Sequence, residues 1–179
     1  MQELQASPPV APEIDNLAPL LLALGDDPAN WPAPAAGETA QSMQHLEAIE
    51  ADMLRYEQAE IPVKHILLPG LYARLIEIPA DCRLIGKVQV SPHLNFVLEG
   101  DITFMVDGVV RRVGAGWQGA IQGGTKKIGY AHARTVWMTV HPNPDNETDV
   151  KVLEQRIAAD TYAIYLERTR QLPAPGEHA

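Results

Sequence analysis

The sequence predicts a mainly β protein: one small antiparallel β-barrel, preceded by an extended arm and a helix and followed by a second helix. From Val63 onward the apolar residues adopt a period of two, in short runs rich in Val, Ile, Leu, Thr and aromatic residues. Turn signals such as Pro69-Gly70 and Gly123-Gly124 separate these runs at intervals of about 8–12 residues, which is typical of a sandwich or barrel. Asp107-Gly108, between FMV and VVRRV, is a strong hairpin signal. We therefore place the barrel at residues 61–145.

The composition fits one folded domain with some appended structure. The chain has 179 residues, of which 46% are hydrophobic, and this is enough to form a real core. The net charge is −9 and the pI is about 5.0, and the Lys and Arg residues are scattered along the chain. Such a protein has no basic field that would attract nucleic acid or anionic lipid, so we expect neither a nucleic-acid partner nor a membrane partner.

Cysteine usage and the apolar runs bound the protein class further. Cys82 is the only cysteine, which excludes an internal disulfide framework and a multi-cysteine zinc site and fits a reducing compartment. The N-terminal sequence lacks a basic start followed by an apolar run, so we expect no secretion signal. The longest apolar stretch, residues 17–24, is far short of the roughly 20 residues that span a bilayer. We expect a soluble protein.

Residues 1–39 predict an extended arm. They contain seven of the 15 prolines together with many alanines, and proline excludes a long helix or an interior strand. The leucines between Leu17 and Leu24, together with Trp31, are too apolar for a pure linker. Two interpretations stay open: a disordered linker, and an arm that docks on its own barrel or on a neighbouring subunit.

Helical periodicity occurs on both sides of the barrel. In residues 40–60, Leu46, Ile49, Met53 and Tyr56 recur at spacings of three and four, and Pro62 ends the pattern. We favour an amphipathic helix packed on its own domain over one that pairs between subunits. Residues 146–179 predict a second helix and a frayed tail; the apolar face of this helix consists of Val150, Leu153, Ile157 and Tyr162.

One segment of the barrel has a recognisable motif. Gly86 precedes His93-Leu94-Asn95, Glu99 follows four residues after Asn95, and Gly108 closes a hairpin. This resembles the first motif of the cupin superfamily: a glycine, His-x-His, a glutamate and a glycine. The second cupin motif, a proline–glycine turn with a histidine three residues after the glycine, maps onto residues 122–127 and the strand 135–141.

The stretches GKVQVSPHLNFVLEGDITF, GGTKKIGYAH and TVWMTVHP are similar to short cupin-like proteins of tailed bacteriophages. The resemblance covers about half of the chain and leaves out the N-terminal arm. It implies a jelly-roll barrel of the cupin type.

The departures from the cupin motifs concern the residues that bind the metal in metal-binding cupins. A metal cupin uses imidazoles and one carboxylate, which suit Fe, Mn, Ni and Zn. His93 and Glu99 match, but Asn95 replaces the second imidazole and Lys127 replaces the histidine of the second motif. An ammonium group repels a cation and has no lone pair to donate. We therefore expect no metal and no other cofactor, and predict that Lys127 and Glu99 form an ion pair in the barrel.

Other candidate residues have structural explanations. Gln89 has the parity to point into the barrel, where it would add to the polar interior. His141 ends a strand before Pro142, so we expect it to make a structural hydrogen bond, and we assign Trp137 to the core. No Ser–His–Asp arrangement, phosphate loop or pair of carboxylates is found, so we assign no catalytic residue.

The leading hypothesis is a non-catalytic cupin-fold protein with a structural or assembly role, associated with a phage as a virion component. We expect a homo-oligomer, with the arm contacting other virion proteins, located in the virion or the host cytoplasm. The alternative is a small-ligand-binding or enzymatic cupin, with or without a metal. Its polar interior would consist of Gln89, His93, Asn95, Glu99 and Lys127.

Overall fold

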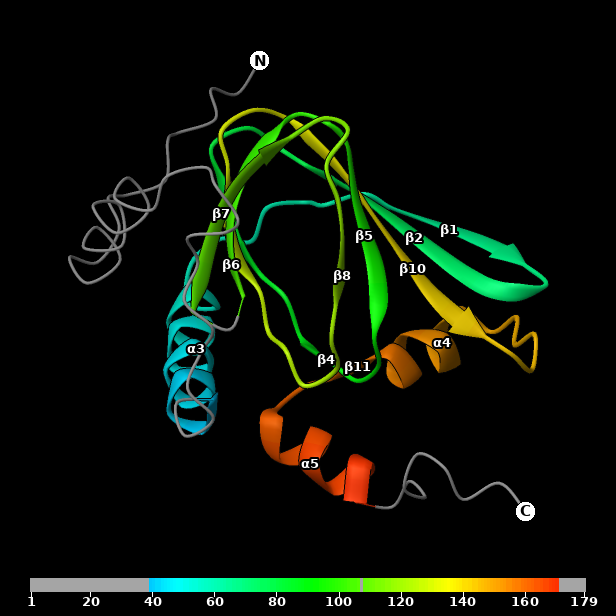
Figure 1. Ribbon diagram of the computed structural model, residues 1–179. Coiled ribbons are helices and arrows are strands. Elements are labelled where there is room, and N and C mark those ends of the chain that lie inside the picture. The colour runs from blue at the N-terminus through cyan, green and yellow to red at the C-terminus, as the bar shows by residue number, and fades with distance from the viewer. Residues whose placement is uncertain (1–38, 107, 171–179) are drawn as a thin grey trace.

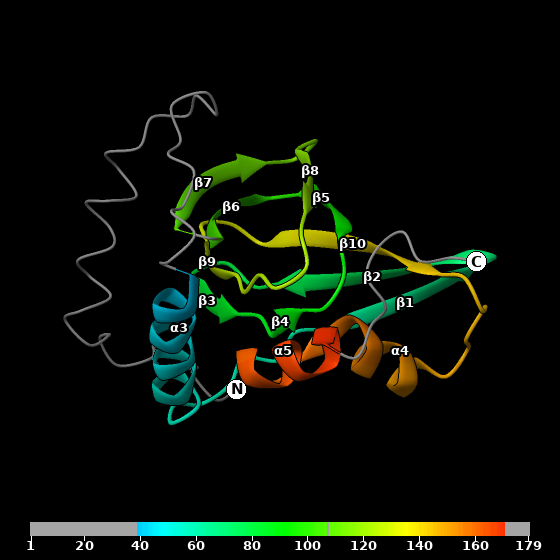
Figure 2. The same ribbon diagram turned by 60° about the horizontal axis from the view of Figure 1, so that its bottom comes forward.

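The computed structural model describes residues 39–106 and 108–170, and antiparallel β-sheet is the main secondary structure among them. A five-stranded sheet has the order β1-β2-β10-β5-β8, a four-stranded sheet has the order β3-β9-β6-β7, and β4 pairs with β11 (Figures 1 and 2). The strands are β1 Val63–Leu68, β2 Gly70–Ile78, β3 Cys82–Ile85, β4 Val88–Gln89, β5 His93–Glu99, β6 Asp101–Val106, β7 Val109–Gly114, β8 Gln118–Ile121, β9 Ile128–Ala131, β10 Thr135–Asn143 and β11 Ala158–Ala159. The predicted mainly β fold is confirmed.

The two larger sheets face each other and enclose one apolar core. Phe104 and Trp137 meet edge to face with ring centroids 5.1 Å apart, and Trp117 packs against both rings. The rest of this core comes from both sheets and consists of Ile78, Val97, Ile102, Val106, Ile121 and Ala131. The hairpin predicted between β6 and β7 is present, since Val106 pairs with Val109 and Gly108 has a φ of 74°.

The N-terminal helix is shorter than predicted. Helix α3 spans Thr39–Met53 and buries Met43 and Leu46 against the domain, beside the four-stranded sheet in Figures 1 and 2. The prediction that the helix continues to residue 60 is wrong: the chain leaves the helix in tighter turns, in which the N–H of Arg55 donates to the Asp52 carbonyl and that of Tyr56 to the Met53 carbonyl. The Gln58 side chain donates to the same Met53 carbonyl at 2.9 Å. Tyr56 therefore lies outside the helix and is exposed. The predicted arm, apart from Thr39, lies outside the described residues.

The single C-terminal helix that the sequence predicts is two helices. Helix α4, Val150–Ile157, starts at Asp149, whose side chain accepts from the backbone N–H of Lys151. It ends where Ala158 and Ala159 become extended to pair with β4. Helix α5, Tyr162–Arg170, follows, and both helices lie next to the β4–β11 pair (Figure 2). Within the described part of the chain, no helix is both long and apolar enough to cross a bilayer.

Candidate ligand-binding site

The inward-facing side chains of the five-stranded sheet change from apolar to polar along the strands. Residues directly opposite each other on antiparallel strands share a face, so each cross-strand row can be followed through the sheet. One row is Val97–Trp137–Ile76, and the next along the strands is Asn95–Thr139–Arg74. His141 then pairs with Tyr72, and its ring stacks on His93 with centroids 4.7 Å apart. The polar end of this sheet is the base of the candidate site.

Lys127 reaches this polar end from the opposite side of the barrel. It directly precedes β9, and its backbone carbonyl accepts from the N–H of Gly86, which continues the pairing of β9 with β3. Its Nζ lies 2.8 Å from Asn95 Oδ1 and 3.3 Å from His93 Nε2. The same nitrogen lies 5.5 Å from the centre of the Trp137 ring. Where the second cupin motif has a histidine, this chain therefore has an amino group inside the barrel.

The protonation state of His93 follows from its partners. Its Nδ1 lies 3.1 Å from the carbonyl oxygen of Ser91, which can only accept, so Nδ1 carries the hydrogen. Nε2 then has a lone pair and accepts a hydrogen bond from Lys127. Burial, reinforced by the neighbouring Lys127, lowers the pKa of His93 to about 4, so the ring is neutral at pH 7.

Burial also lowers the pKa of Lys127, to about 7, because desolvation disfavours the ammonium form. Its two hydrogen-bond partners, Asn95 and His93, are both neutral. Within the described residues Lys127 has no carboxylate within salt-bridge distance. This amino group thus changes between charged and neutral forms near neutral pH.

Several buried nitrogens at the site lack a hydrogen-bond partner among the described residues. Asn95 Oδ1 accepts from both Lys127 and Trp137 Nε1, while its Nδ2 has no partner. Both ring nitrogens of His141 also lack a hydrogen-bond partner among the described residues, although the residue is only 1% exposed. Burial lowers the pKa of His141 to about 3, so this ring is neutral too. Buried polar atoms need partners, and water or a ligand in the adjoining space would supply them.

A cavity of about 630 Å³ adjoins these groups. Lys127, Thr139 and His141 line it, as do the apolar side chains of Ile78, Phe104 and Trp137. The charged residues along its walls are five cations and two anions: Arg74, Lys87, Lys127, Lys151, Arg168, Glu154 and Asp160. With Lys127 in its ammonium form the walls carry an excess of three positive charges, in a protein whose net charge is −9.

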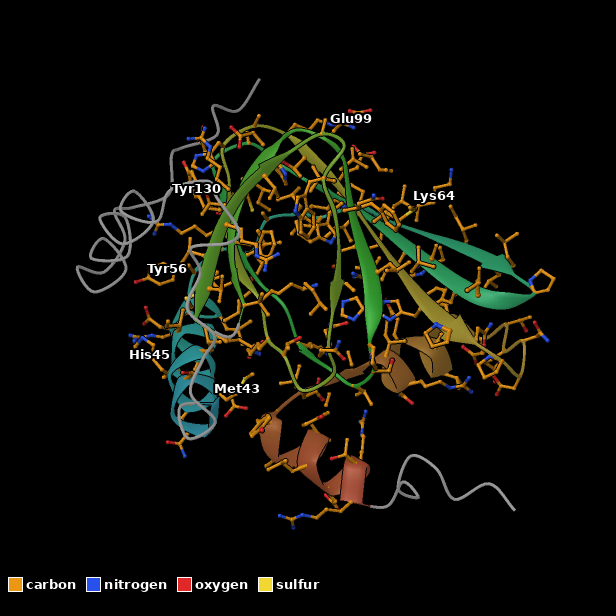
Figure 3. All side chains as sticks on the ribbon, viewed as in Figure 1. Met43, His45, Tyr56, Lys64, Glu99 and Tyr130 are labelled. Atoms are coloured by element: carbon orange, nitrogen blue, oxygen red, sulfur yellow. The ribbon has the colours of Figure 1, made fainter. Side chains whose placement is uncertain are left out.

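Glu99 is not part of the site, so the predicted ion pair with Lys127 is wrong. The pairing of β5 with β10 shifts by one residue here: Trp137 lies opposite Val97, but Val136 lies opposite Glu99. This bulge at Leu98 reverses the alternation of faces, and Glu99 points out of the barrel, as Figure 3 shows at the rim. Its Oε2 lies 2.7 Å from Arg134, in an exposed salt bridge.

The turn at Gly100, directly after Glu99, requires a glycine. Gly100 has a φ of 96°, and a Cβ at this position would collide with the Arg134 carbonyl oxygen and with Thr135. Only glycine combines that backbone conformation with that close approach.

The other predicted site residues are divided between the cavity and the cluster around Lys127. Gln89 lines the cavity, but its Nε2 donates to the Lys87 carbonyl at 3.4 Å and not to the cluster. The sequence analysis placed His93, Asn95 and Lys127 in the interior and assigned Trp137 to the core only. It missed the role of His141, for which it predicted a structural hydrogen bond that the described residues do not provide. Parity with Trp137 along β10 could have shown that His141 also faces inward.

The residues present do not fit the metal of a metal cupin. Only His93 offers an imidazole at the motif positions, Asn95 Oδ1 is occupied by two donors, and Glu99 points away. Among the described residues no group of three or more His, Cys, Asp or Glu side chains could hold a metal ion. We derive no metal-dependent chemistry for this site.

This mismatch gives a first testable prediction. Asn95→His combined with Lys127→His would bring three imidazoles together and remove the amino group. We expect the double variant, purified without a His tag, to bind about one Zn²⁺ or Ni²⁺ per chain by elemental analysis. The unaltered protein should bind none stoichiometrically, and a metal-free double variant would contradict the assigned geometry.

The comparisons with known proteins found similarities among solved structures only. No protein-family model and no curated protein matches the sequence. Among solved structures, KdgF from a Halomonas species is similar in fold, with 15% identity over 52% of this chain and 86% of that chain and a TM-score of 0.43. A cupin-2 domain protein from Shewanella frigidimarina has 13% identity over 53% of this chain and 92% of that chain, with a TM-score of 0.39. A double-stranded β-helix protein from Klebsiella pneumoniae has 11% identity over 52% and 85%, with a TM-score of 0.43. At these identities the similarity concerns the fold alone.

Proposed function

We propose that the barrel binds a small organic anion, a carboxylate with an apolar body, in the cavity beside Lys127. The observation that carries this proposal is a buried amino group whose hydrogen-bond partners within the described residues are neutral. A buried cation is costly without a counter-ion. A ligand carboxylate would supply that counter-ion, and the unpartnered nitrogens of His141 and Asn95 lie in the same region.

The charges on the cavity walls support an anion over a neutral ligand. Arg74 pairs with Glu154 at 3.5 Å and Lys87 pairs with Asp160 at 2.6 Å. The other three cations, Lys127, Lys151 and Arg168, have no ion-pair partner among the described residues. A cavity with excess charge of one sign concentrates ligands of the opposite sign. The apolar walls around Trp137 would take the rest of the ligand.

Calorimetric titration with benzoate, succinate and propionate tests this proposal, with the corresponding amides as neutral controls. We expect carboxylates to bind and amides not to bind. Affinity should be highest below pH 7 and should fall by about tenfold per pH unit above the pKa of Lys127, because the carboxylate needs the ammonium form.

Two variants sharpen the experiment. Lys127→Met should abolish carboxylate binding, while Lys64→Met is the matched control, because Lys64 is exposed on β1 and does not line the cavity (Figure 3). Equal binding of carboxylates and amides, or unchanged binding in Lys127→Met, would contradict the proposal.

The phage-associated assembly role stays a prediction, supported by the sequence resemblance and the proline-rich arm. A homo-oligomer in a virion or in the host cytoplasm is likewise a prediction. One feature of the fold is compatible with a subunit contact: the β1–β2 hairpin extends beyond the barrel and exposes Leu67, Leu68 and Leu71 (Figure 1). Ligand binding inside the barrel and assembly through its outside do not exclude each other.

A further inference from the structure

We propose that Lys127 is a nucleophile that forms an imine with a reactive carbonyl, so that the ligand class is small aldehydes and 2-oxo acids. This inference rests on the ligand-binding function proposed above and adds a covalent step to it. It requires an amine that faces a cavity, a proton acceptor beside it, and space for the carbonyl carbon. The cavity beside Lys127 supplies the space, and His93 Nε2 is the acceptor beside the amine.

The proton acceptor is His93. Its Nδ1–H is held by the Ser91 carbonyl, so the lone pair of Nε2 faces Lys127 Nζ at 3.3 Å. Asn95 Oδ1 holds the amine from a second direction at 2.8 Å. A lysine nitrogen fixed by two acceptors has a restricted orientation, which favours attack on a carbonyl bound in the cavity. His93 and Asn95 therefore act as positioning residues, and His93 can also relay a proton.

The apolar surroundings favour the reactive form of the amine. Trp137, Phe104 and Ile128 line the same cavity. Burial in these surroundings excludes water, which disfavours the ammonium ion, and the pKa of Lys127 near 7 leaves a substantial neutral fraction at physiological pH. Desolvation in a hydrophobic pocket is one of the known ways to activate a lysine nucleophile.

The step balances without an external oxidant or reductant. The lone pair of Nζ forms a bond to the carbonyl carbon, and the C=O π electrons move to oxygen. One proton passes from nitrogen to that oxygen through His93 Nε2 or water, which gives a carbinolamine. The hydroxyl takes a second proton and leaves as water with the electrons of the C–O bond. Starting from the ammonium form, the products are a protonated imine and one water molecule.

His141, with Lys151 and Arg168 on the cavity wall, would hold the carboxylate of a 2-oxo acid while its carbonyl reacts with Lys127. The His141 ring lies between His93 and Tyr72, with centroids 4.7 Å and 6.1 Å away, and both its nitrogens lack a partner among the described residues. One of those nitrogens can donate to a ligand oxygen. Binding of a 2-oxo acid would therefore give hydrogen-bond partners to the His141 ring nitrogens, which a purely structural role of His141 does not explain.

Reductive trapping tests the inference on the full-length protein. The protein is incubated with glyoxylate or with pyruvate at pH 7.5, sodium cyanoborohydride is added, and the intact mass and peptide masses are measured. We expect one adduct per chain, located on Lys127, formed at least tenfold faster than on Lys64. Lys127→Met and Lys127→Arg should both lose the fast adduct. The arginine variant keeps the charge, and thermal unfolding of both verifies that they fold.

Competition separates failure of the inference from failure of the proposed function. Benzoate should slow trapping at Lys127, and the trapping rate should rise with pH through 7 whereas benzoate affinity falls. If benzoate binds but Lys127 is not trapped, or if Lys87 or Lys151 is trapped instead, the imine inference is overturned and the proposed function stands. If Lys127 is trapped without any competition by carboxylates, the carboxylate-binding function is overturned and the imine inference stands. If carboxylates neither bind nor compete and no adduct forms, both are wrong.

The role of His93 has its own readout. His93→Gln should slow trapping at Lys127 and change its pH profile, because the amide cannot accept and release a proton as imidazole does. Equilibrium benzoate affinity should change little, since the ammonium group remains. Loss of both properties together would indicate that His93 is only structural.

Discussion

Replacing Glu50 with glutamine is expected to lower the free energy of unfolding by about 3 kcal/mol, because it leaves the ammonium group of Lys126 buried and without a counter-ion. Lys126 Nζ lies 2.7 Å from Glu50 Oε2, and the lysine side chain is 0% exposed. Surface ion pairs contribute little, but removal of one partner from a buried pair leaves the other charge uncompensated. The effect should therefore be far larger than that of an ordinary surface substitution.

Urea denaturation at pH 7 measures this effect, and the same helix offers a matched control. Asp52 forms an exposed ion pair with Arg55 at 3.3 Å, in which Arg55 is 79% exposed. Asp52→Asn should change stability by less than about 1 kcal/mol. Adding Lys126→Met to Glu50→Gln should recover much of the loss, since an apolar side chain of similar length removes the unpaired charge. Equal effects of Glu50→Gln and Asp52→Asn would show that Lys126 does not depend on this partner.

The Glu50–Lys126 contact also positions the candidate site. Successive side chains of an extended chain point to opposite sides, so Lys126 reaches out to α3 while Lys127 reaches into the barrel. A second contact holds α3 in place: Glu47 Oε1 accepts from the backbone N–H of Tyr162 at 2.7 Å. Helix α3 therefore anchors the segment that carries the site amine.

The sequence was sufficient for the barrel and for part of its interior. Alternation with period two predicted the strands because it reflects one buried face and one covered or exposed face, while the resemblance to the cupin motif placed His93 and Asn95 in the interior. It failed at Glu99, because a one-residue bulge against β10 inverts the faces and no composition signal marks it. It also failed at the end of α3, because the chain leaves the helix in turns of the i→i+3 type after Met53, well before Pro62.

The interior of the barrel was harder to predict than its strands. The replacement of a histidine by Lys127 suggested an ion pair with the nearest carboxylate in the motif. In the folded protein the closest partners are instead an amide and an imidazole, brought together from strand β5 and the start of β9. Contacts between opposite sheets depend on long-range packing, which local patterns do not encode. His141 shows the same limit, since its missing partners become visible only in three dimensions.

Lys127→Met is expected to remove a pH-dependent contribution to the free energy of unfolding on the order of 2–3 kcal/mol. This figure is smaller than the full pKa shift of Lys127 implies, because water in the cavity partly solvates the amine. The pKa of Lys127 is about 7 in the folded protein and 10.5 in an unfolded chain. Below pH 7 both states carry the ammonium, so the folded state bears its full desolvation cost. Between pH 7 and 10.5 the unfolded state binds more protons than the folded state, so stability rises with pH.

The measurement is the free energy of unfolding of the two proteins at pH 6, 8 and 9.5, with Lys64→Met as control. We expect the unaltered protein to gain stability relative to Lys127→Met across this range. His93 and His141, whose folded pKa values are about 4 and 3, lower stability below pH 6.5, and part of each shift comes from Lys127. The comparison between pH 8 and pH 9.5, where both imidazoles are neutral in the folded and the unfolded chain, therefore isolates the lysine. Lys64→Met should track the unaltered protein at every pH, because Lys64 is exposed. If the difference between the unaltered protein and Lys127→Met does not change with pH, the Lys127 amine has the pKa of an ordinary lysine. The carboxylate and imine proposals would then lose the near-neutral titration on which their pH dependence is based.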